Sequence, residues 1–221
     1  MTLVTLETVR KDEEVQTLID YANRYLRELG YTEHSTRHAA LVAETAWSIL
    51  NDLGHPERVC ELAAIAGYLH DIGNLIHRQN HALGGSLIAM GILSRLGMPM
   101  DECALIMNAI GNHEEERGYA TTPVSAALNI ADKSDVHRSR VQAEGFDDFD
   151  IHDRVNYATT QSRVITDASG RIINLDLTID TSFAAVIEYF EIFLDRMVMV
   201  KQAAEFLGCH FRLTVNRTAF S

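Results

Sequence analysis

The feature that most constrains the fold of this chain is an apolar run that ends in a His-Asp pair. Residues 57–69 are rich in alanine and leucine and predict a buried helix, which leads directly to His70-Asp71 and is broken at Gly73. Polar side chains at the edge of a core need partners, and adjacent histidine and aspartate are good partners for a divalent cation. We therefore expect the rest of the fold to supply further ligands at this point.

Apolar residues recur at helical spacing on both sides of this run, with glycine and proline residues between the periodic segments. The pattern predicts helices over residues 12–29, 35–53, 57–69, 81–96, 100–112 and 124–141, and a short helix over 151–159. We expect residues 1–158 to form one all-helical domain, because no other secondary structure interrupts the series.

The pattern changes from residue 159 onward. Residues 162–166 and 171–179 predict two strands joined by a hairpin turn, 183–207 a long amphipathic helix, and 210–216 a third strand. We expect residues 159–221 to form a small α+β appendage with a two- to three-stranded antiparallel sheet. Since so small a sheet is marginally stable alone, the appendage should pack on the body or on a partner subunit, which makes a homodimer possible.

Composition excludes several classes of protein. The 221-residue chain is 47% hydrophobic and 23% charged, which is typical of a globular domain. Its net charge of −12 argues against binding to bulk nucleic acid or to an anionic membrane. No apolar run reaches the ~18 residues that a membrane span needs. The three scattered cysteines indicate reduced core residues, so we expect a cytoplasmic protein.

Two further residues could complete a metal site with the His-Asp pair. His38 lies early in the helix predicted over 35–53, and Asp132 lies on an otherwise apolar face of the helix over 124–141. An acidic side chain on such a face is costly unless a cation meets it. Two imidazoles and two carboxylates suit Mn, Fe, Zn, Ni, Co or Mg, and do not distinguish among these ions.

The order His38, His70-Asp71, Asp132, with the Leu-His-Asp-Ile-Gly context around the pair, resembles the HD superfamily of metal-dependent phosphohydrolases. The resemblance covers roughly residues 30–142 of the chain. It implies that the fold class is mainly α, with an HD-type helical bundle as the core and the α+β appendage at the C-terminus. A second pair, His152-Asp153, lacks an apolar helix before it, and we interpret it as a surface feature.

His81 and His113 lie where binuclear members of the family, which include the HD-GYP proteins and HD-type diadenosine tetraphosphate hydrolases, hold a second metal. The resemblance therefore implies a metal site made of His38, His70, Asp71, His81, His113 and Asp132. One or two divalent ions would bind, and Asp71 would bridge two. Three departures, at Asn74, at the single His113 and at Gly118-Tyr119-Ala120, give a cyclic-dinucleotide phosphodiesterase weak support.

The resemblance implies hydrolysis of a small phosphate ester, most readily a nucleotide, by water that the metal activates. Asp71 or Asp132 could orient the nucleophile, and Lys133 could offer its charge to the substrate phosphate. We interpret Arg138 and Arg140 as a solvated helical face. We interpret His34 and His77 as residues that either contact the ligands from behind or line the rim of the pocket.

Two alternatives remain open. Some relatives with a binuclear iron site are oxygenases, and the same six ligands would serve them. The chain could also be a non-catalytic, metal-stabilised ligand sensor whose C-terminal segment binds a partner.

Overall fold

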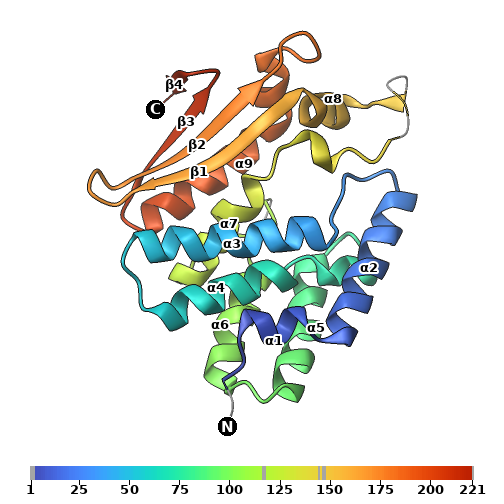
Figure 1. Cartoon of the computed structure of the whole chain (residues 1–221), viewed down its shortest axis with the longest axis vertical. Coiled ribbons are helices and arrows are strands. Elements are labelled where there is room, and N and C mark those ends of the chain that lie inside the picture. Colours follow the sequence, from blue (N-terminus) through green and yellow to red (C-terminus); the bar gives the residue numbers. More distant parts are fainter. Residues whose placement is uncertain (1–2, 116–117, 144, 146–147, 221) are drawn as a thin grey trace.

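In the computed structural model of the chain, helices form a body and the strands gather at one end of the molecule, above it (Figure 1). The structure describes residues 3–115, 118–143, 145 and 148–220. The elements of the body are α1 (Leu6–Arg10), α2 (Glu13–Glu28), α3 (Thr36–Asp52), α4 (Glu57–Leu69), the 3₁₀ helix η1 (Ile72–Leu75), α5 (His81–Arg95), α6 (Met100–Gly111), α7 (Pro123–Lys133), the 3₁₀ helix η2 (Arg138–Arg140) and α8 (Ile151–Ala158). The C-terminal part consists of β1 (Thr159–Asp167), β2 (Ile172–Ile179), α9 (Val186–Phe206), β3 (His210–Val215) and β4 (Thr218–Phe220).

Helices α3 and α4 lie side by side because small residues line their contact (Figure 1). Ala43 and Ala46 of α3 and Ala63 of α4 are fully buried. Gly67 of α4 meets the backbone of α3, since an added Cβ atom would lie 2.9 Å from the Cα atom of Ala43. This close packing brings the N-terminal half of α3 alongside the C-terminal end of α4.

Helix α7 is the central helix of the body. All ten residues from Val124 to Lys133 are buried, as expected for a helix that packs on every side; α3, α4, α6 and α9 all contact it. Pro123 occupies its first turn, and Thr122 and Ser125 form a capping box there. The helix thereby carries its two charged C-terminal residues into the interior.

The helix predicted over 124–141 ends at Lys133, so the predicted end was wrong. Ser134 follows as the C-cap, and its hydroxyl donates to the carbonyl oxygen of Ala131. The chain then turns, and Asp135 contacts the side chains of Arg37 and His38. The chain leaves the helix here because Asp135 contacts charged and polar side chains of α3. The apolar periodicity of residues 124–141 carries no information about such a contact with another helix.

The C-terminal sheet has four strands in the order β1-β2-β3-β4. Strands β1 and β2 are antiparallel, β2 and β3 are parallel, and β3 and β4 are antiparallel. The mainly helical class is confirmed, but the prediction of a two- to three-stranded antiparallel sheet was wrong. Helix α9 is a crossover that returns the chain in the same direction, which makes β2 and β3 parallel. Strand β4 has only three residues, too few for an alternating pattern.

The appendage packs on the body of its own chain. Tyr189, Phe193 and Val200 of α9 are buried, and α9 lies against α7. Ser162 of β1 donates its hydroxyl hydrogen to the carbonyl oxygen of Ser134. Helix α8 ends at Ala158 and β1 begins at the next residue, where we place the domain boundary, which stays a prediction. Within the described part of the chain, no helix has the length and apolar character to cross a membrane.

The contact at Gly67 provides a test of this packing. We expect Gly67→Ala to lower the free energy of unfolding by about 1–3 kcal/mol, because the added methyl group forces α3 and α4 apart. Gly91→Ala on α5 is the matched control, since an added Cβ atom there has no neighbour within 4 Å. It should leave stability unchanged or raise it by up to about 1 kcal/mol. Urea unfolding of both variants measures this, and equal effects would contradict the assigned contact.

Candidate metal centre

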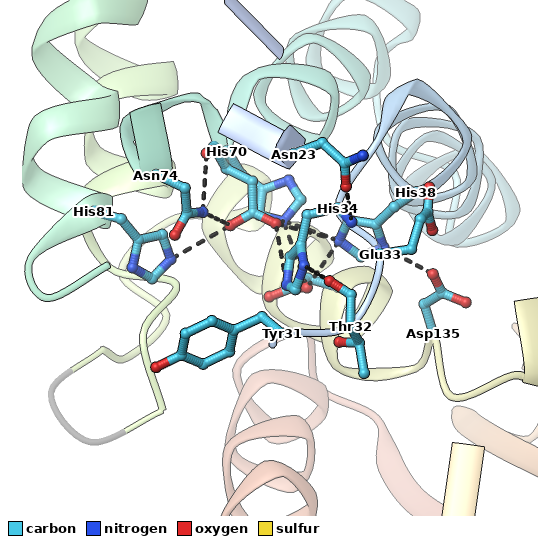
Figure 2. Close-up of polar contacts among 12 residues, drawn as sticks. Asn23, Tyr31, Thr32, Glu33, His34, His38, His70, Asn74, His81 and Asp135 are labelled. Atoms are coloured by element: carbon cyan, nitrogen blue, oxygen red, sulfur yellow. Dashed lines mark hydrogen bonds and ion pairs between the residues drawn. The ribbon is translucent and has the colours of Figure 1, made fainter. Parts of the chain in front are cut away.

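The structure brings all six predicted ligands together at the centre of the body. They come from five helices or the residues beside them: His38 from α3, His70 and Asp71 from the end of α4, His81 from the start of α5, His113 from the end of α6, and Asp132 from α7. His38, His70, His81, His113 and Asp132 are buried, and Asp71 is partly buried. Figure 2 shows His38, His70 and His81 directed toward a common centre.

Four of these residues form a first set of ligand atoms. The Nε2 atoms of His38 and His70 are 3.3 Å apart. Each lies near Oδ2 of Asp71, at 3.5 Å for His38 and 3.1 Å for His70. Each also lies 3.5 Å from Oδ1 of Asp132. Ligands bound to one ion at ~2.1 Å stand roughly 3.0–3.5 Å from each other, so these five distances are those expected of atoms around one cation.

The other oxygen of Asp71 faces a second set. Its Oδ1 atom lies 3.4 Å from Nε2 of His81 and 3.8 Å from Nε2 of His113. These two nitrogen atoms are 3.0 Å apart. Asp71 therefore offers one oxygen atom to each pair of histidines, which is the arrangement of a carboxylate that bridges two ions.

Hydrogen bonds through Nδ1 orient the four histidines. The Nδ1 atoms of His70, His81 and His113 lie 2.8, 2.9 and 2.6 Å from backbone carbonyl oxygens three residues earlier. Nδ1 of His38 lies 2.7 Å from Oδ2 of Asp135. A carbonyl or carboxylate oxygen can only accept, so the hydrogen sits on Nδ1. Each Nε2 atom then faces the centre, as in metal-binding histidines.

The charges of the cluster call for a cation. Burial alone would lower the pKa of His70, but Asp71 and Asp132 outweigh burial and raise it to about 10. Burial alone would raise the pKa of each of these aspartates, but neighbouring positive groups hold it well below its usual range. His113, in contrast, has its pKa lowered by burial to about 4. The site thus stabilises positive charge between its two carboxylates. A divalent ion bound there would supply that charge. The nitrogen and oxygen donors present fit such an ion.

Two supporting residues were not identified from the sequence. Asp135 is 1% exposed and accepts hydrogen bonds from His38 and from Nη2 of Arg37. Asn74 donates from Nδ2 to Oδ1 of Asp71 at 2.9 Å. The sequence had marked Asn74 only as a departure from a related branch, and the structure shows that it orients the carboxylate of Asp71. The one feature of the sequence that could have indicated Asp135 is its position, as a second acidic residue three positions after Asp132.

Lys133 and His34 lie at the edge of the ligand cluster. Nζ of Lys133 is 2.7 Å from Oδ2 of Asp132. His34 follows the pattern of the ligands, with Nδ1 2.6 Å from the carbonyl oxygen of Thr32 and Nε2 3.9 Å from Oδ2 of Asp71. His77 is exposed and is not among the residues that line the cavity described below.

The two arginines after the last ligand differ. Arg138 is exposed, as expected of a solvated face. Arg140 is 4% exposed and donates to the carbonyl oxygens of Glu33 and Asp135, so that expectation was wrong for Arg140. The change of direction after Lys133 turns its side chain inward. His152 of the second His-Asp pair has a side chain that is 52% exposed.

A cavity of about 410 Å³ opens from the cluster. Its walls are polar and carry both signs of charge. They are formed by His34, Asp71, Arg78, Gln79, Asn80, His81, His113, Glu114, Glu115, Asp132, Lys133, Arg140 and Arg196. Arg196 belongs to α9, so the C-terminal part of the chain contributes to this wall.

Residues 31–137 match the family model of the HD domain. Among solved structures, the chain is similar to a predicted HD superfamily hydrolase from an uncultured Thermotogales bacterium. The two are 24% identical with a TM-score of 0.45, and the alignment covers 56% of this chain and 67% of that one. No curated protein matches the chain.

The contact between Asp135 and His38 predicts the effect of a conservative change. We expect Asp135→Asn to weaken binding of a divalent ion by about 10- to 100-fold, because His38 loses the charged acceptor that orients its ring. Asp20→Asn, at an exposed position of α2, is the control and should bind as the unaltered protein does. Calorimetric titration of metal-free protein with Mn²⁺ measures both, and unchanged affinity in Asp135→Asn would contradict this role.

The pKa of His70 predicts how the metal-free protein responds to pH. Its value of about 10 in the folded state exceeds the value of about 6.5 in an unfolded chain. The folded state therefore holds this proton more tightly, and the resulting stability is complete below about pH 6.5 and is lost as the pH rises toward about 10.

We expect the unfolding temperature of the metal-free protein to fall between about pH 7 and about pH 9.5. The fall should be smaller in metal-loaded protein, where the cation replaces the proton as the positive charge. Scanning calorimetry compares the two forms. Parallel profiles would mean that the cation and this proton do not occupy the same place.

Proposed function

Because residues 31–137 of this chain match the family model of the HD domain, we propose that the protein is a metal-dependent hydrolase of phosphate esters. The observation that carries the proposal is the position of Asp71, whose two oxygen atoms each face a different pair of histidine nitrogens. That arrangement supports two ions rather than one. Bound divalent ions acidify water and offset negative charge on a phosphoryl group.

The residues of the chain have distinct roles in this proposal. His38, His70, Asp71 and Asp132 hold one ion, and Asp71 with His81 and His113 holds the other. Asp71 and Asp132, which both line the cavity, also orient the attacking water. Lys133, whose side chain is 9% exposed beside Asp132, donates to a phosphate oxygen of the substrate.

The cavity supports a small substrate. Its volume of about 410 Å³ is within the range of sites for small molecules and too small for a folded macromolecule. Its wall includes the cationic groups of Arg78, Lys133 and Arg196, although the chain as a whole carries a net charge of −12. These cationic groups stand among carboxylates in the same wall and offer contacts to a small anion. A nucleotide is the substrate that we propose.

The test is phosphate release with the metals exchanged. Protein stripped with a chelator should be inactive and should recover activity with Mn, Co, Ni, Fe or Mg on p-nitrophenyl phosphate or on one of a panel of nucleotides. Asp71→Asn should lower kcat/KM by more than about 100-fold, since even residues that only orient ligands contribute about 10- to 100-fold. Asp20→Asn should keep full activity.

Absence of turnover with every metal, in protein shown to be metallated, would contradict the proposal. Oxygen uptake by the iron-loaded protein without phosphate release would instead identify the oxygenase alternative. Binding of two ions with neither reaction would favour a metal-stabilised sensor.

A further inference from the structure

A second cavity adjoins the one at the metal centre. It also has a volume of about 410 Å³, and it contains none of the six ligands in its wall. Five residues line both cavities: His34, Arg78, Glu115, Arg140 and Arg196. The rest of the second wall comes from residues 29–32 before α3 and from the C-terminal half of the chain, including Asn156 of α8 and Phe193 of α9. The two cavities therefore form one cleft between the helical body and the C-terminal elements.

The three arginines at the junction differ in how they are engaged. Arg140 is buried and donates through Nε, Nη1 and Nη2 to carbonyl oxygens of Glu33 and Asp135, which makes it part of the framework. Arg78 donates to Oδ1 of Asn74, and its guanidinium lies 5.3 Å from the centre of the Tyr31 ring. Arg196 forms an ion pair through Nε with Glu115 at 2.7 Å, and its side chain is 24% exposed.

Arg196 is held in a fixed direction at the junction. Its Cζ atom lies 4.4 Å from the centre of the Phe193 ring, and Phe193 is 1% exposed. Stacking on a buried ring restricts the guanidinium, and the ion pair with Glu115 restricts it further. A guanidinium has five N–H donors in a planar fork, and its ion pair with Glu115 engages Nε. The remaining nitrogens suit bidentate binding of a phosphate or carboxylate.

A series of ion pairs relates Arg196 to the metal centre. Lys133 lies 2.7 Å from Asp132 and 3.4 Å from Oε1 of Glu115, and Arg196 lies 2.7 Å from the same oxygen atom. The order along the wall is a metal ligand, a cation beside it, a shared carboxylate, and then Arg196. Lys133 is therefore the cation next to the ligand cluster, and Arg196 lies one shared carboxylate further along the wall.

We propose that Arg196 binds a second anionic group of the substrate, beyond the reacting phosphate, and that the C-terminal helix thereby completes the substrate site. The substrate class is then a phosphate ester that carries at least two anionic groups, such as a nucleoside diphosphate. This inference rests on the proposed function for the identity of the reacting group. Its test uses binding alone, so that it succeeds or fails separately from turnover.

The experiment compares two probes on metal-loaded protein by titration calorimetry: inorganic phosphate, which has one anionic group, and ADP, which has two. Arg196→Ala should raise the Kd for ADP by about 10- to 100-fold, the loss expected for a charge-assisted contact, and should change the Kd for phosphate by less than about 3-fold. Arg196→Lys should recover part of the affinity for ADP, because lysine keeps the charge without the fork.

Two further variants separate substrate binding from a structural role. Lys201→Ala, on the same helix with a side chain that is 65% exposed, should leave both affinities unchanged. If Arg196 only anchors the segment that carries Glu115, then Glu115→Gln should weaken ADP binding as much as Arg196→Ala does. If Arg196 binds the substrate, Glu115→Gln should leave ADP binding unchanged or tighten it, because a competing carboxylate is removed.

The inference is overturned if Arg196→Ala leaves the Kd for ADP unchanged, or weakens phosphate and ADP equally. It is also overturned if Glu115→Gln matches Arg196→Ala. Loss of turnover on every phosphate ester, with the selective effect on ADP binding intact, would overturn the proposed function and leave this binding role in place.

Discussion

The structure depends on the cost of placing Asp71 and Asp132 among buried histidines. Two carboxylates in such surroundings need positive charge. Without a metal, Lys133 beside Asp132 and a protonated His70 provide it, and the pKa of His70 is raised to about 10. A divalent ion meets the same need with stronger bonds to more atoms. The body supports this centre by orienting each histidine through Nδ1, so the four Nε2 atoms face the same region.

Packing between helices sets the geometry of this centre. The close contact between α3 and α4 at Gly67 and Ala43 puts His38 opposite His70. Helix α7, buried on all sides, carries Asp132 to the same place. Asp135 connects the end of α7 back to α3 through His38 and Arg37. A shift of one of these helices against another would therefore change the distances between the ligand atoms.

The C-terminal segment contacts the helical body through an ion pair between Arg196 and Glu115 as well as through buried apolar residues. Phe193 packs inside the protein and supports Arg196, which faces the cleft. The segment lies outside residues 31–137, which match the HD domain. The matched region contains the six candidate ligands, and the proposed discrimination among substrates comes from a part of the chain outside it.

The sequence by itself determined the helical character of the body and four candidate ligands, His38, His70, Asp71 and Asp132, because helical periodicity and the cost of buried charge are local properties of the chain. His81 and His113 were expected only from the resemblance to the HD superfamily. The sequence also located the change to strands near residue 159. The tertiary structure alone decided the direction of β3, since a crossover depends on where α9 packs, and the end of α7, since Asp135 is held by residues about a hundred positions away. The same reason applies to Arg196: its contacts with Glu115 and the cleft join segments that no sequence pattern relates.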